Sequence, residues 1–446
     1  MTGPRRTAQE RIVARMKQYR IPHTIDLREA PDRFHNFAVG LYLLHMAVMA
    51  NLTLCFEDAL LRFRMPSFLL AALLALIAVG YRAAFRGVPL RALLLYLVFF
   101  SMAASAALSQ PEALTYMKDI LFSGSFVKFA LLFSLVFVFE EEPETRVRQL
   151  TVISIVSLLV YQLGVSRGVF VYDDGKFAYM PIGYGAAPWW CIVAQGVFYY
   201  KNKFARLICL VTAAYFAVFI ATYGNRGALV VVLAALAVFL VVYVPLKHLV
   251  LLGGFAVLAI MGALLFLEPI MGMAGKFLGF DLTQSRTFRL VSSGRLWYDS
   301  GRFPIYKACF GAILRSPLLG NGAGGDFIAT SSQLDEASYA HNIVIELCVD
   351  FGVVAGALVY IWLLYIGARM LFKCRDRSQR ALFLPFYVFS MIKLFFSGTF
   401  YESGYLLASV MIYAACSSRS QSPVRRNGES AVQAVRISPS AEGGIP

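Results

Sequence analysis

Residues 206–244 read RLICLVTAAYFAVFIATYGNRGALVVVLAALAVFLVVYV, and this stretch decides the fold class. Two apolar blocks, 206–223 and 227–244, flank a short turn that contains Arg226. Similar blocks of roughly 17–25 residues, the length that crosses about 30 Å of hydrocarbon as a helix, recur along almost the whole chain. Of the 446 residues, 59% are hydrophobic and only 15% are charged, whereas about a quarter of a soluble domain is charged. We therefore predict an all-α membrane protein.

The apolar blocks predict about twelve transmembrane helices and one long periplasmic loop that contains short helices. The predicted spans are 37–56, 67–82, 92–109, 119–139, 149–166, 186–200, 206–223, 227–244, 248–267, 342–371, 381–399 and 403–416. Connections rich in Lys and Arg alternate with poorer ones, and the rich ones are expected in the cytoplasm, together with both termini.

The same alternation predicts the domain organisation. The predicted parts are a cytoplasmic N-terminal segment (1–35), transmembrane helices 1–9 (36–267), a periplasmic loop (268–341), transmembrane helices 10–12 (342–416) and a disordered cytoplasmic tail (417–446).

Charge and cysteine usage narrow the function classes. The net charge of +15 is typical of cytoplasmic loops facing anionic lipid, and no separate basic domain indicates a nucleic-acid partner. Most of the seven cysteines fall inside apolar blocks, and no Cys or His cluster has zinc spacing. The sequence therefore predicts no structural metal.

The predicted periplasmic loop is strongly basic between residues 286 and 315, which read RTFRLVSSGRLWYDSGRFPIYKACFGAILR. Asp299 is the one acid among six cations, which are Arg286, Arg289, Arg295, Arg302, Lys307 and Arg315. Arginine's planar fork suits phosphate oxygens, so a diphosphate at the membrane surface is the natural partner. A solvated basic face that touches lipid head groups is the alternative.

Short helical and turn segments are predicted within this loop. Pro304 suits the first turn of a helix, in which Ile305, Cys309 and Ile313 share a stripe and which Ser316-Pro317 ends. The following LLGNGAGGDF (318–327) lacks the pattern of a nucleotide loop, but a tight turn with exposed N–H groups is an open alternative.

Two further residues lie at the predicted outer interface. His341 is the only histidine expected there, where it could accept a proton or donate to an oxyanion, although a structural role is the commoner one for a lone histidine. Arg226 lies close to hydrocarbon and should face protein or a ligand, unless it snorkels to the head groups. Lys128 and Lys393 fall inside predicted spans and could pair with Glu346 or Asp350 or line a polar cavity.

These residues together resemble the O-antigen polymerase and O-antigen ligase superfamily of bacterial membrane glycosyltransferases. The resemblance covers roughly residues 205–371. The matching pieces, in family order, are Asn225-Arg226-Gly227-Ala228, then Ser300-Gly301-Arg302 with Ile305-Tyr306-Lys307-Ala308 and the 316–322 segment SPLLGNG, then His341-Asn342 with Asp350-Phe351-Gly352 and Gly356. An earlier SGR at 293–295 competes for the loop position, but the spacing of the motifs that follow favours Arg302.

The resemblance implies a GT-C-like transferase of the bacterial inner membrane with a periplasmic active site. It would take a glycan from undecaprenyl diphosphate without a metal or cofactor and join repeat units into O-antigen, capsule or exopolysaccharide. Arg226, Arg302 and His341 would be catalytic, with His341 acting as a base or as a diphosphate ligand. The expected substrate-binding residues are Arg289, Arg295, Lys307 and Asn342.

Alternatives remain at this point. The motif set also fits a ligase that moves a finished glycan onto lipid A-core or protein, and a polysaccharide transporter or flippase is a third reading. Expected partners are the lipid-linked glycan and membrane lipid, with a chain-length regulator or a flippase as further candidates.

Overall fold

The computed structural model describes residues 30–49, 52, 55, 57–86, 111–121, 131–138, 140, 142–171, 178–245, 247–248, 276, 302–334, 338–401 and 403–420. Every regular element in these residues is a helix. In chain order they are α2 (Ala30–Leu44), the π-helical η1 (His45–Met49), α4 (Glu57–Arg86), α6 (Pro111–Leu121), α7 (Phe133–Val138), α8 (Pro143–Ser166), α9 (Tyr179–Tyr199), α10 (Lys203–Tyr223), α11 (Arg226–Tyr243), α15 (Arg302–Arg315), α16 (Gly325–Ser331), α17 (Ile343–Phe372), α18 (Arg377–Lys393) and α19 (Gly404–Ser420).

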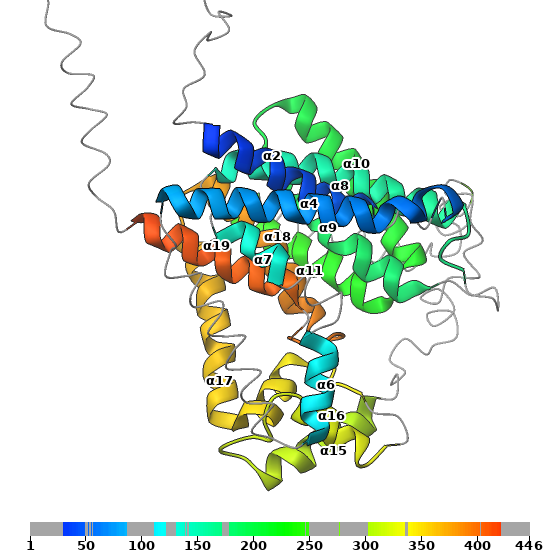
Figure 1. Ribbon diagram of the computed structural model, residues 1–446, viewed down its shortest axis with the longest axis vertical. Helices are drawn as coiled ribbons and strands as arrows, with labels where there is room; N and C mark the ends of the chain where they lie inside the picture. Colours follow the sequence, from blue (N-terminus) through cyan, green and yellow to red (C-terminus); the bar gives the residue numbers. More distant parts are fainter. Residues whose placement is uncertain are drawn as a thin grey trace, which may run out of the picture.

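The helices form an upper bundle and a lower layer (Figure 1). The bundle contains α2, α4, α7 to α11, α18 and α19, and within it α9 packs against α8, α10, α11 and α18. The lower layer contains α6, α15, α16 and the start of α17, and α17 then runs up one side to the bundle.

Small residues and aromatic rings bring the bundle helices close together. Gly183 of α9 lies against Ala228 of α11, since a Cβ on Gly183 would stand 2.9 Å from the Ala228 Cβ. Small residues at such contacts allow helix backbones to approach closely, which strengthens packing where the solvent is itself apolar. Elsewhere in the core, the ring of Phe133 meets those of Phe386 and Tyr405 edge-on, at 5.6 and 5.3 Å between centroids.

Five helices among the described residues are long and apolar enough to cross a membrane. They are Pro66–Ala84, Pro143–Ser166, Lys203–Tyr223, Arg226–Tyr243 and Ile343–Phe372. Each coincides with a predicted span, so the predicted all-α, multi-pass membrane character is confirmed. The predicted spans 92–109 and, beyond His248, 248–267 lie outside the described residues, as do residues 1–29 and 421–446.

The two ends of the predicted span 119–139 belong to different parts of the structure, and residues 122–130 between them lie outside the described residues. The first residues of the span complete α6, which belongs to the lower layer, and its last residues form the short α7 of the bundle. The reason is that α6 is amphipathic. Its residues Met117 and Ile120 are buried against Ala323 and Tyr401, while Lys118 and Asp119 are exposed.

The predicted span 342–371 contains a kink at Gly352. Gly352 has φ 80° and ψ 163°, so the helix α17 consists of a first segment, 343–351, and a second, 353–372, joined at a kink. The turn 317–322 packs into this kink, where Val353 N donates to the carbonyl of Pro317 at 2.8 Å. A Cβ on Gly352 would stand 2.2 Å from the Leu318 carbonyl oxygen, so only glycine fits here. The kink keeps 343–351, with its buried Glu346 and Asp350, in the lower layer.

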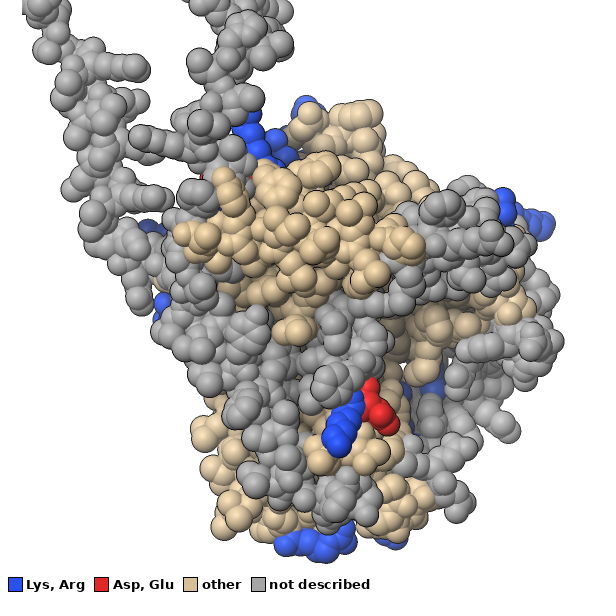
Figure 2. Space-filling view, viewed as in Figure 1, with Lys and Arg blue, Asp and Glu red and all other residues tan. Residues whose placement is uncertain are grey.

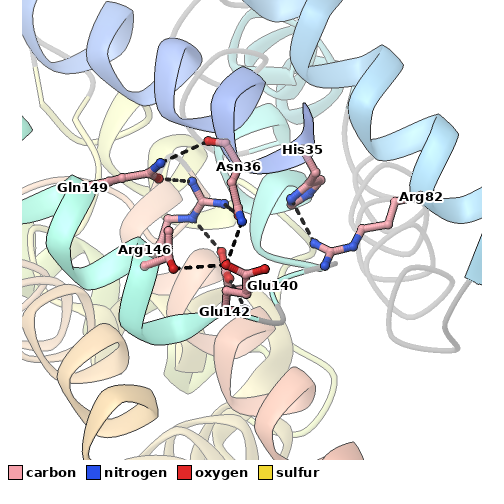
Figure 3. A network of polar contacts seen from close by, with 8 residues as sticks. His35, Asn36, Arg82, Glu140, Glu142, Arg146 and Gln149 are labelled. Carbon is pink, nitrogen blue, oxygen red and sulfur yellow. Dashed lines mark hydrogen bonds and ion pairs between the residues drawn. The ribbon is translucent and has the colours of Figure 1, made fainter. Parts of the chain in front are cut away.

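The opposite end of the bundle is fixed by a buried polar network (Figure 3). The guanidinium of Arg146, in α8, donates to Glu140 at 2.6 Å, to Gln149 at 2.6 Å and to Asn36 of α2 at 3.0 Å. Arg82 of α4 contacts His35 and Asp32 of α2, each at 2.9 Å. Buried charges are tolerated when they are paired and hydrogen-bonded. The network therefore joins α2, α4 and α8 at one end.

The outer face of α4 has the character of a lipid-facing surface. Leu69, Leu70 and Leu73 expose 63, 58 and 54% of their area. Figure 2 shows this face as a broad area without charged residues, with Lys and Arg gathered towards its margins. Exposed large apolar patches mark a partner or a membrane, and here the length of the helix indicates the membrane.

The kink provides a first prediction. We expect Gly352→Ala to cost at least about 1–3 kcal/mol, because the new Cβ meets backbone and φ is positive. The measurement is the midpoint of thermal unfolding in detergent. The control is Gly80→Ala in α4, where a Cβ would meet nothing within 4 Å and a helix should gain slightly. Equal midpoints for the two variants would contradict the described turn.

Candidate functional site

The ends of four helices meet around Tyr184, which lies in the second turn of α9. Its side chain is hydrogen-bonded to those of Asn225, just before α11, and Ser397, just after α18, and it lies in the electrostatic field of Arg302 at the start of α15. The Lys393 ammonium, at the end of α18, stands 5.7 Å from the centre of the Tyr184 ring. Tyr184 therefore connects the bundle to the lower layer.

Contacts within the structure explain the residue types in the segment Asn225-Arg226-Gly227-Ala228. Asn225 caps α11, because its Oδ1 accepts from the N–H of Ala228 at 2.8 Å. Gly227 leaves room for Tyr184, whose hydroxyl would lie 1.9 Å from a Cβ at that position. Ala228 is fully buried against α9. This arrangement fixes Arg226 as the first residue of α11.

Arg226 and Arg302 share an unusual electrostatic position. Each is the first residue of its helix, and both are half-buried. The N-terminal end of a helix carries a partial positive charge, so a cation there reduces helix stability. Two arginines and two helix N-termini near one tyrosine make a strongly electropositive region, which favours an anionic ligand.

His341 stands beside this region in a strained conformation. It is the only non-glycine residue with positive φ among those described, at 54°. Its Nε2 lies 3.2 Å from the Ser338 hydroxyl, and its ring packs on Tyr339 at 4.1 Å between centroids. Its Nδ1 is buried and makes no hydrogen bond within the described residues. Strained residues held by their surroundings gather at functional sites.

The charge state of His341 follows from its surroundings. Burial, and then the nearby charge of Arg302, lower the pKa of His341 to about 4. The imidazole is therefore neutral near pH 7. One of its two nitrogens carries a lone pair, and that nitrogen can accept a proton.

Backbone contacts on both sides hold His341 in place. Before it, the Asp326 carboxylate accepts from the N–H of Ala340 at 2.7 Å, and burial raises the pKa of Asp326 to about 6. After it, the N–H of Ile343 donates to the carbonyl of Leu394 at 2.9 Å, close to Lys393. These contacts bring His341 next to the end of α18.

Buried carboxylates attach the lower layer to the bundle. Asp350 accepts from the Tyr401 hydroxyl at 2.6 Å and from the N–H of Asp326 at 3.1 Å. Glu346 accepts from the Thr399 hydroxyl and, at 3.0 Å, from the N–H of Phe400. Both carboxylates therefore bind the 394–403 connection and the start of α16 rather than Lys393, which faces Tyr184.

Several N–H groups of the glycine-rich turn 317–322 donate to backbone carbonyls of the protein. The N–H of Asn321 donates to Val349 at 2.8 Å, and that of Gly322 donates to the Asp350 carbonyl at 2.9 Å. Gly320 has φ 70° and touches the same backbone. The turn uses these N–H groups to bind the kink in α17, so they are not open to a phosphate.

Arg302 lies close to both His341 and Tyr184, and Arg226 begins α11 between Asn225 and Gly227, two residues that contact Tyr184. Lys307 is exposed on α15, and the Asn342 side chain caps α17 by accepting from the N–H of Val344 at 3.0 Å. Arg289 and Arg295 lie outside the described residues. No group of three potential metal ligands occurs in the described part of the chain.

Two residues of the site were not expected from the sequence. Tyr184 and Ser397 lie in or beside apolar segments, where a single polar side chain gives no signal of its partners. The close contact that Gly227 makes with Tyr184 explains why a glycine follows Arg226.

The predicted helix at the start of the described loop is confirmed. It runs from Arg302 to Arg315, with Cys309 and Ala312 buried and with Ile305 and Ile313 partly buried beside them. The stripe orients α15 so that its first residue reaches the Tyr184 region.

Comparison with known proteins identified one family. Residues 208–361 match the family model described as O-antigen ligase, a segment that contains Arg226, Arg302 and His341. Searches of curated proteins and of solved structures found no match.

The link between Arg302 and His341 provides a second prediction. Arg302→Gln should raise the pKa of His341, because it removes a nearby positive charge. NMR titration of labelled histidine rings, assigned with His341→Gln, measures this. Lys307→Gln on the same helix is the control and should leave the titration unchanged. An equal shift in both variants would mean that Arg302 is not the neighbour described.

The sign of the pH effect on stability follows from the same pKa. As the pH falls, His341 takes up a proton in the unfolded chain, where its pKa is near the ordinary histidine value of 6.5, before it does so in the folded chain. The stabilising contribution of neutral His341 is therefore complete above about pH 6.5 and is lost as the pH falls towards about 4. The unfolding midpoint of the wild type should fall over this range more than that of His341→Gln.

Proposed function

Through residues 208–361 this chain belongs to the superfamily of O-antigen polymerases and ligases, and we propose that it transfers a glycan from undecaprenyl diphosphate to an acceptor hydroxyl. We assign it the polymerisation of lipid-linked repeat units into O-antigen, capsule or exopolysaccharide. The proposal is supported by the proximity of Arg302 to both His341 and Tyr184 and by the position of Arg226 in the turn that contacts Tyr184.

The two arginines are suited to the leaving group. Transfer breaks the bond between the anomeric carbon and the diphosphate, and the departing diphosphate takes the electron pair. Guanidinium groups bind phosphate oxygens through paired N–H donors and stabilise the charge that develops on them. The two helix N-termini and the Lys393 ammonium add to the same field.

His341 is suited to the acceptor. As a neutral imidazole with a buried, uncommitted Nδ1, it could take the proton from the acceptor hydroxyl as that oxygen bonds to the anomeric carbon. A diphosphate bound near Arg302 would offset the positive charge that lowers the pKa of His341, and so make the imidazole a stronger base in the complex. Tyr339 and Ser338 would hold the ring in position.

The orientation in the membrane is part of the proposal. Arg226 begins α11 and Lys393 ends α18, and basic connections lie at the opposite end of the bundle, at 201–206, where α10 begins, and at 372–380, where α18 begins. The excess of Lys and Arg on short connections favours the cytoplasm for that end. The site then faces the periplasm at the inner membrane, where lipid-linked glycans would be its substrate.

Ligation is the second candidate function. The description of the matching family as O-antigen ligase favours it, and the same residues would perform the same transfer to lipid A-core or to protein. A flippase is less consistent with the site, because its cations lie at helix ends rather than at mid-depth, where transporters bind their substrates.

The assigned site provides a third prediction. Arg226→Ala and Arg302→Ala should each lower glycan output by about 10²–10³, because each removes one stabilising donor from the charge that develops in the transition state. His341→Ala should lower it as well, and Arg302→Lys should recover only part of the loss, because lysine lacks the paired donors. The measurement is glycan produced by a complemented deletion strain at equal protein levels.

Arg315→Ala is the matched control. Arg315 is exposed at the far end of α15, in the same basic loop, and its loss should leave output near wild type. Full output from all three site variants would show that the site has been assigned to the wrong residues.

Product analysis separates the two reactions and gives a fourth prediction. A strain lacking a polymerase should accumulate single repeat units on undecaprenyl diphosphate, with no longer chains. A strain lacking a ligase should accumulate long chains that remain on that lipid. Mass spectrometry of the extracted lipid fraction distinguishes them, and accumulation of long chains would replace polymerisation by ligation in the proposal.

A further inference from the structure

A second basic region lies at the far end of the same helices. A pocket of about 800 Å³ opens between the C-terminal ends of α9 and α11 and the N-terminal ends of α10 and α18. Its cations are Lys201, Arg206, Arg375, Arg377 and Arg380. It lies about 27 Å from Arg226 along the 18 residues of α11, which is close to the thickness of the hydrocarbon core.

These five cations have no carboxylate partner among the residues that the structure describes. No ion pair of any of them occurs within the described residues, where the ion pairs involve Arg82, Arg146 and Arg148. The nearby Asp376 does not line this pocket, and its carboxylate is used to cap α18 by accepting from the N–H of Ser378 at 2.8 Å. Like charges this close repel each other, so a bound anion would stabilise the arrangement.

Two of the five cations cap the end of a helix, and the other three are available to a ligand. Arg206 donates to the Val197 carbonyl at 3.1 Å, and Arg377 donates to the Phe198 carbonyl, so both cap the end of α9. Arg380 stacks over the Tyr243 ring at 5.8 Å, and its Nε is buried without a hydrogen-bond partner in the described residues. Lys201 and Arg375 are exposed.

The walls of the pocket indicate a lipid rather than a free anion. Apolar residues line it beside the cations, including Phe198, Val242 and Val244. Next to it, α10 exposes 71% of Phe204 and 55% of Leu207, and such surfaces face acyl chains in a membrane protein. A site that is basic at the membrane surface and apolar towards its interior matches a phospholipid, whose phosphate and acyl chains have the same order.

We propose that this pocket binds the phosphate head group of an anionic phospholipid from the cytoplasmic leaflet. Arg375, Arg380 and Lys201 contact the phosphate, and Arg206 and Arg377 position it by holding the end of α9. Two helix N-termini, those of α10 and α18, face the same place and favour negative charge. The proposal rests on the fold and its orientation, and it does not depend on glycosyl transfer.

The test uses the full-length protein in nanodiscs made of phosphatidylglycerol and phosphatidylcholine. After gentle extraction, native mass spectrometry counts the lipids that stay bound. The wild type should retain phosphatidylglycerol preferentially. The triple variant Lys201→Gln, Arg375→Gln, Arg380→Gln should retain on the order of ten-fold less, since each basic residue contributes severalfold to head-group affinity. The double variant Lys201→Gln, Arg375→Gln alters only exposed residues, so it tests the pocket without changing the stability of the fold.

A charge-matched variant is the control. Arg148→Gln, Lys203→Gln, Lys373→Gln removes three exposed cations from the same end of the molecule but none from the pocket, and it should retain lipid like the wild type. Equal losses in the two triple variants, or wild-type retention by both pocket variants, would overturn the proposal. Displacement of the lipid by millimolar inorganic phosphate would also overturn it, because the pocket would then be a site for a free anion.

Discussion

The contact between the 317–322 turn and the kink at Gly352 is the constraint on which the site depends. Without it, α17 would continue as one straight helix, and the residues before it would have no reason to lie beneath the bundle. The kink turns residues 343–351 into the lower layer. Asp350 then ties that segment to Tyr401, and Glu346 ties it to Thr399 and Phe400. Since His341 precedes this segment and α15 packs on it, the kink determines where His341 and Arg302 lie.

The distribution of charge over the bundle follows from the direction of its helices. The helices α9, α11 and α18 each run from one end of the bundle to the other, so the candidate site and the proposed lipid pocket use opposite ends of these three helices. At each end, two helix N-termini coincide with a group of arginines or lysines. A cation at a helix N-terminus is unfavourable by itself. Cations lie at helix N-termini at both ends of the bundle, and anionic ligands at both membrane surfaces would offset this unfavourable arrangement.

Buried charge serves a different purpose where it is fully paired. Arg146 and Glu140 are buried, but the Arg146 guanidinium donates to three side chains, so its desolvation is offset by hydrogen bonds (Figure 3). This network closes one end of the bundle, and the Arg146 guanidinium is used within the protein. The arginines of the candidate site differ, because they lie half-buried at helix starts, beside a neutral histidine.

The sequence by itself determined the membrane class, five helices long and apolar enough to cross a membrane, and the helix that follows Arg302. Apolar length and local turn chemistry carry these properties, since they depend on neighbouring residues along the chain. The tertiary structure decided what depends on distant partners. The kink at Gly352 needs the turn at 317–322. The amphipathic α6 joins the lower layer because its apolar face meets Ala323 and Tyr401. Tyr184 is a site residue because α11 begins and α18 ends beside it. No pattern within a single segment encodes such contacts, because both partners are needed to define them.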